Sequence, residues 1–163
     1  MIDPHKPKYF PLYWNIAQAA AEQSPAQRMK VGAALVTPTG MISIGWNAMP
    51  AGFDNNCETW EEVDDPYGLE DATHQLVTKP EVVHAERNAI DKMTRQGVST
   101  HGSILFVTCA PCFECAKALH SLGLKAIYYS QTYRSDAGLR FLESCGVTCE
   151  HRSKSPEFSK TRR

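Results

Sequence analysis

Two short segments of the chain hold residues that could bind a metal ion. His84 and Glu86 stand two residues apart in VVHAERNAI, where a helix is expected to begin. Cys112 and Cys115 stand three apart in TCAPCFECAKAL, and Pro111 before them suits the first turn of a second helix. Residues at i and i+3 share a helix face, and the free N–H groups of a first turn favour anionic sulfur. Two thiolates placed in this way form a good pair of ligands for one cation.

A third soft ligand would complete a catalytic zinc site, which uses three protein ligands and keeps one position for water. We predict that His84, Cys112 and Cys115 form this site. Glu86 stands too close to His84 to be incidental, and its carboxylate could accept and return a proton without binding the metal. Zinc in such a site lowers the pKa of bound water to around 7. H-x-E followed by P-C-x-x-C is the signature of zinc deaminases.

Each part of this pattern also has an ordinary explanation. A C-x-x-C pair can be a redox pair, a histidine at a helix start is more often a cap or surface residue, and a first-turn glutamate usually serves the helix dipole. A zinc-stapled binding module without chemistry is a further alternative, although such modules usually close the metal with a fourth protein ligand. No fourth ligand stands near these motifs and Glu86 would then have no role, so the catalytic interpretation is favoured.

The elements that must position these residues alternate between helices and strands. Helices are predicted over 11–24, 82–97, 112–123 and 136–146, and strands over 30–37, 41–46, 103–108, 125–130 and 147–151. This order implies helices on both faces of a mostly parallel sheet, which its opening hairpin makes mixed. Successive helix starts lie along one sheet edge, so the two motifs can meet in space. In the first helix, Leu12, Ile16, Ala19 and Ala20 are expected to form the buried stripe.

Length, composition and charge restrict the class of protein. A chain of 163 residues, 42% apolar and 21% charged, suggests one soluble domain, expected over 1–152. The net charge of −1 lacks the basic excess of a nucleic-acid binder, so no nucleic-acid partner is expected. No long apolar run and no signal peptide are present, so we expect a cytoplasmic protein without a membrane span. The six cysteines are then thiols or metal ligands rather than a disulfide frame.

Two stretches show no regular pattern. Residues 47–80 are polar, acidic and rich in turn residues, and a loop of this length in a compact domain is usually functional. We expect this loop to cover a ligand or a neighbouring subunit, and the basic tail over 153–163 to be mobile. Cys57 and His74 lie in the long loop, but two ligands without an evident third do not predict a second, structural zinc.

Five segments resemble, in order, those of the cytidine and deoxycytidylate deaminase superfamily, and most closely the deoxycytidylate (dCMP) deaminases: VGAALV, GWNAMPAG, HAERNAI, VTCAPCFECAKAL and YRSDAGLRFLESCGV. They cover most of residues 28–147. The resemblance implies a three-layer α/β/α cytidine-deaminase-like fold with a five-stranded mixed sheet, and zinc held by His84, Cys112 and Cys115. It also implies hydrolysis of dCMP to dUMP and ammonia, with Glu86 carrying a proton to ring N3 and then to the leaving nitrogen.

The resemblance further implies a set of substrate-binding residues: Arg28, Ala33, Asn47, Ala110, Tyr133 and Arg134. Arg28 and Arg134 match positions near the phosphate, where guanidinium groups suit a dianion. Asn47 matches a position that contacts the sugar, and Tyr133 one at the substrate. The backbone around Ala33 and Ala110 matches segments that hold the pyrimidine ring.

Members of this family are commonly hexameric, activated by dCTP and inhibited by dTTP, so the resemblance implies a homo-oligomer with nucleotide effectors, which could carry Mg²⁺. The matching regulatory loop holds Trp46, Asn47, Pro50 and Gly52. Its usual GYNG is GWNA in this chain, which alters the chemistry of that loop. The alternative substrates are 5-modified dCMP, dCTP, free cytidine and, with less support from the bulk charge, adenosine in transfer RNA.

Overall fold

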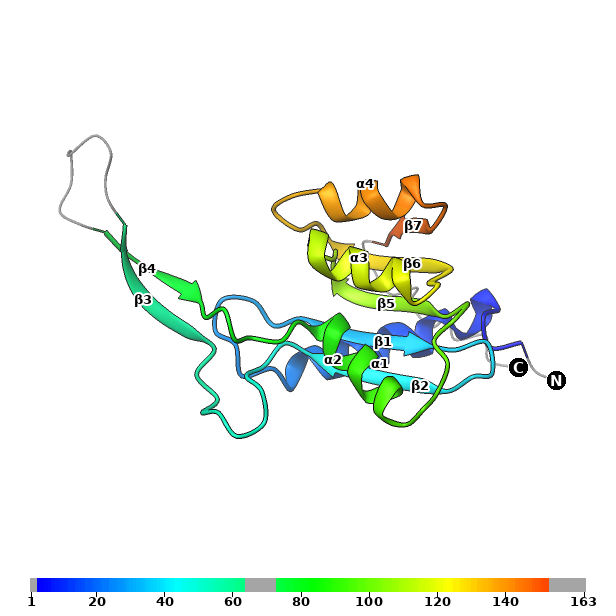
Figure 1. Ribbon diagram of the computed structural model, residues 1–163, viewed down its shortest axis with the longest axis horizontal. Coiled ribbons are helices and arrows are strands. Elements are labelled where there is room, and N and C mark those ends of the chain that lie inside the picture. Colours follow the sequence, from blue (N-terminus) through cyan, green and yellow to red (C-terminus); the bar gives the residue numbers. More distant parts are fainter. Residues whose placement is uncertain (1–2, 64–72, 153–163) are drawn as a thin grey trace, which may run out of the picture.

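The computed structural model describes residues 3–63 and 73–152 (Figure 1). Within them, a 3₁₀ turn η1 (Pro7–Tyr9) precedes helices α1 (Phe10–Glu22), α2 (Ala85–Arg95), α3 (Phe113–Ser121) and α4 (Ala137–Ser144). The strands are β1 (Gly32–Val36), β2 (Ile42–Trp46), β3 (Glu58–Val63), β4 (Thr73–Thr78), β5 (Ile104–Cys109), β6 (Ala126–Gln131) and β7 (Thr148–His151). Every helix and strand predicted from the sequence is present, within a few residues of its expected bounds.

One mixed sheet forms the centre of the molecule. Its strands follow the order β2-β1-β5-β6-β7, and β1 runs antiparallel to both β2 and β5. The pairs β5–β6 and β6–β7 are parallel. Helix α1 covers one face of the sheet, and α2, α3 and α4 cover the other. One apolar cluster lies under α1, and a second lies under the other three helices. The predicted three-layer α/β/α fold with a five-stranded mixed sheet is confirmed.

The buried face of α1 differs from the predicted stripe. Leu12 is 51% exposed, whereas Phe10 and Trp14 are buried and pack edge-on against Phe106 of β5, with ring centroids 5.1 and 5.6 Å apart. Aromatic side chains bury more area than leucine, so turning them toward the sheet stabilises the fold more. The prediction was wrong about Leu12 and Ala19, which are exposed, and right about Ala20, which is buried. Ile16 is partly buried against the same cluster.

Helix α2 lies unusually close to the sheet because of a glycine in β2. A Cβ atom on Gly45 would stand 2.1 Å from the carbonyl oxygen of Ala85, the first residue of α2. The side-chain amide of Asn88 in α2 donates a hydrogen bond of 2.6 Å to the carbonyl oxygen of Trp46, at the end of β2. The first turn of α2, which carries the predicted catalytic glutamate, is thereby fixed against the sheet edge.

A second, two-stranded sheet lies within the segment that was predicted to be a long irregular loop. Strands β3 and β4 pair antiparallel and project from the body of the molecule (Figure 1); we call this hairpin the arm. The prediction of an irregular segment over 47–80 is therefore wrong for the arm. Trp60 is 67% exposed and the two glutamates after it are exposed, so β3 has no core face and lacks the alternation that marks a half-buried strand.

The register of the arm separates the two residues considered for a second zinc. Glu58 pairs with Thr78 and Glu62 pairs with His74. Cys57 precedes one end of this ladder while His74 lies near the other, which is about 16 Å along the strand at roughly 3.3 Å per residue. Cys57 and His74 do not share a cation in this arrangement.

The structure gives limited information on the predicted tail, the domain assignment and the predicted absence of a membrane span. The basic tail over 153–163 lies outside the described residues, and the assignment of 1–152 to a single domain stays a prediction. Of the helices in the part of the chain that the structure describes, none combines the length and the apolar character needed to cross a bilayer.

Candidate metal and active site

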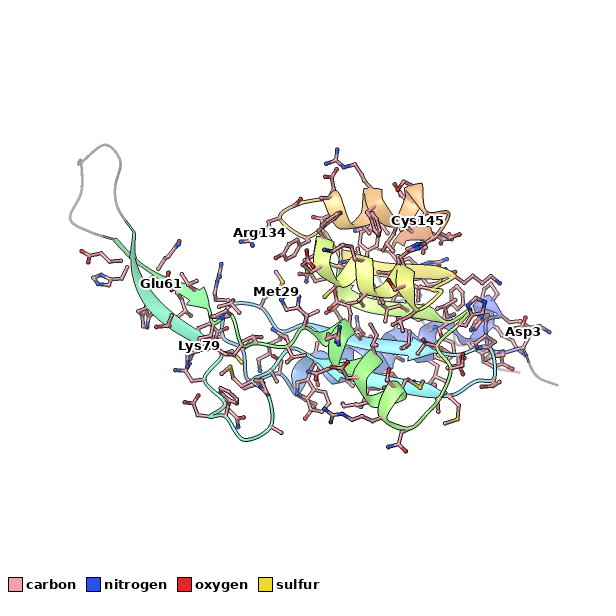
Figure 2. All side chains as sticks on the ribbon, in the orientation of Figure 1. Asp3, Met29, Glu61, Lys79, Arg134 and Cys145 are labelled. Atoms are coloured by element: carbon pink, nitrogen blue, oxygen red, sulfur yellow. The ribbon has the colours of Figure 1, made fainter. Side chains whose placement is uncertain are left out.

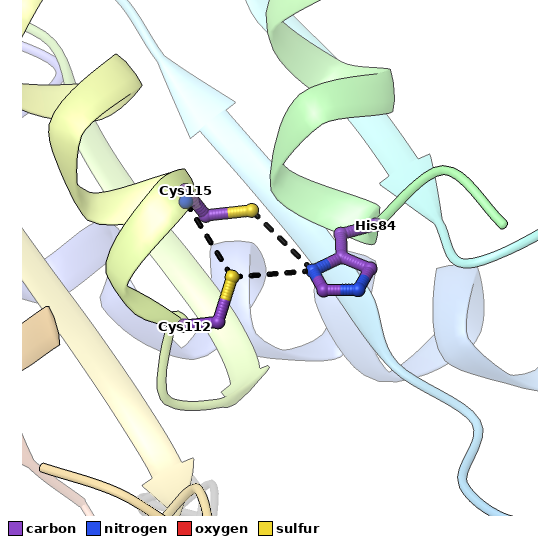
Figure 3. A group of neighbouring side chains, drawn as sticks. All are labelled: His84, Cys112 and Cys115. Atoms are coloured by element: carbon purple, nitrogen blue, oxygen red, sulfur yellow. Dashed lines mark hydrogen bonds between the residues drawn. The ribbon is translucent and has the colours of Figure 1, made fainter. Parts of the chain in front are cut away.

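The two motifs meet where α2 and α3 begin. His84 is the N-cap residue of α2 and Cys112 that of α3, while Cys115 lies in the first turn of α3. The Nδ1 atom of His84 is 3.6 Å from the sulfur of Cys112 and 3.5 Å from that of Cys115 (Figure 3). Gly138 of α4 packs against the Pro111 carbonyl, where a Cβ would stand only 2.5 Å away, so α4 supports the turn that presents the thiols.

This group fits a tetrahedral zinc ion. Among residues 3–63 and 73–152, His84, Cys112 and Cys115 form the one group of three candidate ligands, with ligand atoms within 4.8 Å of one another. With Zn–S near 2.3 Å and Zn–N near 2.05 Å, a tetrahedral angle places nitrogen and sulfur about 3.6 Å apart. The two N···S distances match this separation, and thiolates with an imidazole are ligands that suit zinc. Three ligands leave one position for water, as in catalytic sites.

The surroundings of the thiols favour one thiolate. A hydrogen bond between the two side chains lowers the pKa of Cys112 to about 3, with further lowering by His84 and by the N–H of Cys115. That N–H donates to the Cys112 sulfur at 3.5 Å, as expected for anionic sulfur at a helix start. The bond between the thiols, together with burial, raises the pKa of Cys115. Cys112 is therefore held in the form that binds metal.

Glu86 lies beside these ligands in the first turn of α2 and is 4% exposed. Burial raises the pKa of its carboxyl group to about 7, against the lowering effects of its own backbone N–H and of His84. Burial and the charge of Glu86 raise the pKa of Cys109, at the end of β5, to about 11. No carboxylate of the described residues belongs to the ligand group. The arrangement suits Glu86 to moving protons next to the metal rather than binding it.

Several segments converge on the same sheet edge. The N–H of Gly32 at the start of β1 donates to Thr108 Oγ1 near the end of β5, at 3.0 Å. Ala33 and Ala110 are buried and belong to the same apolar cluster as Ala85, at the start of α2. The structure therefore brings the two alanines predicted near the pyrimidine ring close to the helix that carries Glu86.

Asn47 makes hydrogen bonds that the sequence did not predict. Its Oδ1 accepts from the N–H of Val31 at 2.7 Å, and its Nδ2 donates to the carbonyl oxygen of Met29 at 2.8 Å. The hydroxyl of Ser24 donates to the Asn47 carbonyl oxygen at 2.7 Å. In the structure Asn47 thus fixes the segment that follows Arg28, and its contact with a sugar stays a prediction.

The two arginines predicted near the phosphate both expose their side chains. Arg28 Nη1 is 3.5 Å from Thr78 Oγ1, and Arg134 lies over the ring of Tyr133, 5.5 Å from its centroid. Figure 2 shows Arg134 and Met29, the neighbour of Arg28, on the side of the body that faces the arm. Both guanidinium groups are accessible to an anion, and their part in binding one stays a prediction.

The predicted regulatory loop begins packed and ends exposed. Lys92 Nζ of α2 lies 4.6 Å from the centre of the Trp46 ring, and Ala48 forms a β-bridge to the residue before His84. Pro50 is half-buried, and Gly52 is exposed with φ of +94°, a conformation that favours glycine. This loop is thereby joined by backbone pairing to the residue that precedes His84.

A hollow of about 470 Å³ borders the metal ligands. Its lining includes His84, Cys112 and Cys115 together with Val83, Arg87 and Ile90. It lies along α2 and α3, and the residues predicted to bind substrate do not line it. They lie instead around the sheet edge formed by the starts of β1 and α2 and the ends of β2, β5 and β6.

Taken with the sheet order, three soft ligands at two helix starts and a buried carboxylate beside them define the class. This is the architecture of the zinc-dependent cytidine-deaminase-like fold. Residues 11–131 match the family model described as the cytidine and deoxycytidylate deaminase zinc-binding region. The chain belongs to this family.

Similar proteins include deoxycytidylate deaminases of distant sources. The mouse deoxycytidylate deaminase is 31% identical, over 94% of this chain and 82% of that protein. ComE operon protein 2 of Bacillus subtilis is 34% identical, over 84% of this chain and 70% of that protein. The crystal structure of the dCMP deaminase from cyanophage S-TIM5 in complex with dCMP and dUMP superposes with a TM-score of 0.75 at 37% identity, covering 90% of this chain and 98% of that one.

Proposed function

We propose that the protein catalyses the zinc-dependent hydrolytic deamination of dCMP to dUMP and ammonia. The observation that carries this proposal is the convergence of His84, Cys112 and Cys115, with the buried Glu86 alongside and one ligand position left for water. The choice of dCMP among cytosine compounds is supported by the 37% identical phage enzyme in complex with dCMP and dUMP and by the mouse deoxycytidylate deaminase.

The reaction follows from what the side chains can do. Zinc bound by His84, Cys112 and Cys115 would supply the Lewis acidity that makes water nucleophilic at neutral pH. Glu86 takes a proton from this water and gives it to ring N3, which makes C4 electrophilic. The water oxygen adds at C4, and Glu86 then takes the proton of the new C4 hydroxyl group and gives it to the exocyclic nitrogen. The C4–N bond breaks, ammonia leaves, and the new C4–O bond becomes the carbonyl of dUMP.

In this proposal the nucleotide lies along the sheet edge. The backbone around Ala33 and Ala110 holds the pyrimidine ring, Asn47 contacts the sugar, and Tyr133 lies against the substrate. Arg28 and Arg134 bind the 5′-phosphate through charge-assisted hydrogen bonds, which a nucleoside cannot offer. The exposure of both guanidinium groups supports this assignment.

A substrate comparison tests the proposal. Purified protein is incubated with dCMP, dCTP, deoxycytidine, cytidine and 5-methyl-dCMP, and ammonia release is followed. We expect the highest kcat/KM with dCMP, and loss of the activity after chelation that is restored by zinc. Release from dCTP or from the nucleosides at higher kcat/KM than from dCMP would contradict the proposal and point to the corresponding alternative substrate.

We also propose that the protein forms a homo-oligomer, a hexamer as is common in the family. Its activity responds to the effectors dCTP and dTTP, which bind together with Mg²⁺. The response passes through the loop that holds Trp46, Asn47, Pro50 and Gly52. The β-bridge between this loop and the segment before His84 supplies a route from an effector to the metal ligands. Rates with dCTP·Mg²⁺ and with dTTP, and sedimentation of the protein with each, test this. Deamination rates and a sedimentation mass that respond to neither nucleotide would contradict regulation.

A further inference from the structure

Two carboxylate side chains are buried among the described residues, and one of them is not explained by the chemistry above. They are Glu86 and Glu58, the latter being the first residue of β3 and 2% exposed. An unpaired buried carboxylate is costly unless hydrogen bonds compensate for its lost hydration. Glu58 therefore calls for a function beyond stabilising the arm.

Glu58 binds the backbone immediately around Arg28. Its Oε1 accepts hydrogen bonds from the N–H groups of Gln27 at 3.0 Å and Arg28 at 3.2 Å. Its Oε2 is buried and has no partner among the described residues. The carboxylate thus fixes the backbone of Arg28 without pairing with the guanidinium group, which stays accessible.

The cross-strand partner of Glu58 contacts the other end of the same arginine. Thr78 pairs with Glu58 in the arm, and its Oγ1 lies 3.5 Å from Arg28 Nη1, which is a long and weak contact. One residue pair at the base of the arm therefore touches Arg28 at both its backbone and its side chain.

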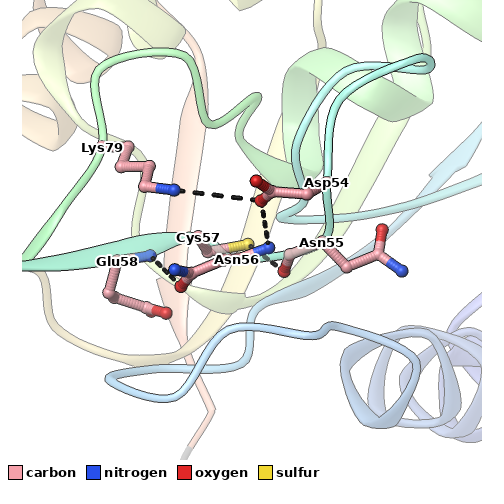
Figure 4. A network of polar contacts seen from close by, with 6 residues as sticks. All are labelled: Asp54, Asn55, Asn56, Cys57, Glu58 and Lys79. Carbon is pink, nitrogen blue, oxygen red and sulfur yellow. Dashed lines mark hydrogen bonds and ion pairs between the residues drawn. The ribbon is translucent and has the colours of Figure 1, made fainter.

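The base of the arm is itself fastened to the body. Cys57, next to Glu58, is fully buried and packs with Ala26 and Val82. Ala26 directly precedes Gln27, and Val82 lies two residues before His84. The N–H of Lys79 donates to the Cys57 carbonyl at 2.9 Å, and Figure 4 shows the surrounding polar contacts. Glu58 consequently has a fixed position from which to hold the arginine.

We propose that Glu58 and Thr78 are positioning residues that hold Arg28 for the 5′-phosphate of the substrate, and thereby set the preference for a nucleotide over a nucleoside. This inference rests on the proposed function, because it assumes that Arg28 binds the phosphate of dCMP. Neither residue touches the reacting atoms in this proposal, so their loss affects substrate binding more than the chemical step.

The experiment compares kinetic constants of single and double variants of the full chain. Glu58→Ala is expected to raise KM for dCMP about tenfold, equivalent to about 1.4 kcal/mol, with kcat within about twofold of wild type and kcat/KM for deoxycytidine unchanged. Glu58→Gln, which keeps an acceptor oxygen, restores most of the dCMP affinity. Adding Glu58→Ala to Arg28→Ala raises KM no further, because Glu58 acts through Arg28.

Matched variants separate positioning from stability. Glu61→Ala changes an exposed glutamate of the same arm and is expected to leave KM unchanged. Thr78→Val keeps the shape of the side chain and raises KM about twofold, which retains a test if Glu58→Ala does not fold. Dissociation constants for dUMP, measured by calorimetry, follow the KM values.

The outcomes distinguish this inference from the function on which it rests. Without dCMP deamination by the wild type, the proposed function fails. If Arg28→Ala leaves KM for dCMP unchanged, the phosphate assignment fails and the inference with it. If Arg28→Ala raises KM but Glu58→Ala and Thr78→Val do not, or lower kcat for dCMP and deoxycytidine alike, the positioning role alone is overturned.

Discussion

Replacing Glu86 by glutamine tests the chemistry most directly. The variant keeps the size of the side chain and the three zinc ligands but removes the carboxylate that would move protons. General acid–base catalysis contributes roughly 10²- to 10⁴-fold to rates, and Glu86 serves two proton transfers in one turnover. We therefore expect kcat to fall by about 10³-fold or more, with zinc content unchanged at one ion per chain.

The structure also predicts that this loss does not come from unfolding. Burial raises the pKa of Glu86 from an ordinary value of 4.5 to about 7. A folded-state pKa above the unfolded one means that stability is lost as pH rises from about 4.5 through 7. In the metal-free protein at pH 8 the charged carboxylate then costs roughly 3 kcal/mol, and glutamine carries no such charge. Thermal unfolding of the metal-free variant at pH 8 should therefore occur no lower than that of the metal-free wild type.

The assay follows ammonia release from dCMP at pH 8, with zinc measured by mass spectrometry and unfolding by circular dichroism. Glu114→Gln is the matched control, because Glu114 also lies in the first turn of a helix at this site but is exposed and pairs with Lys117 at 2.7 Å. We expect the control to retain wild-type kcat. A Glu86→Gln enzyme with more than about a tenth of wild-type kcat would refute the assignment of proton transfer to Glu86.

Four further substitutions probe the ligands, the packing and the substrate side chains. Cys112→Ser is expected to reduce bound zinc, measured on the purified protein, to well below one ion per chain and to abolish turnover. Gly45→Ala places a methyl group against the Ala85 carbonyl 2.1 Å away, so the thermal midpoint should fall by several degrees, together with zinc content. Asn47→Ala removes two hydrogen bonds to backbone and should cost about 1–3 kcal/mol in denaturant unfolding. Arg134→Ala should raise KM for dCMP about tenfold or more while sparing deoxycytidine; an unchanged preference between the two would remove Arg134 from phosphate binding.

The convergence of the three candidate ligands was predictable because each motif is local and the meeting of the two motifs follows from topology. Cys112 and Cys115 could be paired from local sequence alone. The preceding proline indicates a helix start, and the i, i+3 spacing places both thiols on one face of that helix. Their contact with His84 needed one rule about alternating strands and helices, namely that successive helix starts share a sheet edge. Neither step depends on the details of side-chain packing, and the structure agrees with both.

The rotation of α1 and the existence of the arm depended on information that the sequence pattern does not contain. The α1 sequence has apolar residues on more than one face. The face that is buried in the structure is the one whose aromatic rings pack against Phe106. The arm strands bury no common face, so hydrophobic alternation, the main signal for a strand, is absent from residues 58–63. Hydrophobic periodicity identifies a helix or strand because one of its faces is buried. It gives no signal for a strand that projects into solvent.

Glu58 shows the same limit for polar residues. It stands 31 and 30 residues from the two backbone N–H groups that it binds, in a strand where Glu61 and Glu62 are exposed. Nothing in its local sequence distinguishes it from Glu61 or Glu62; only the register of the arm and its packed base single it out. The zinc centre is thus encoded by two short motifs whose meeting follows from the order of strands and helices, whereas the proposed phosphate side of the site is encoded by long-range contacts through the arm. Substitutions at the arm base should therefore alter which substrates bind, and substitutions at the helix starts should alter whether any is converted.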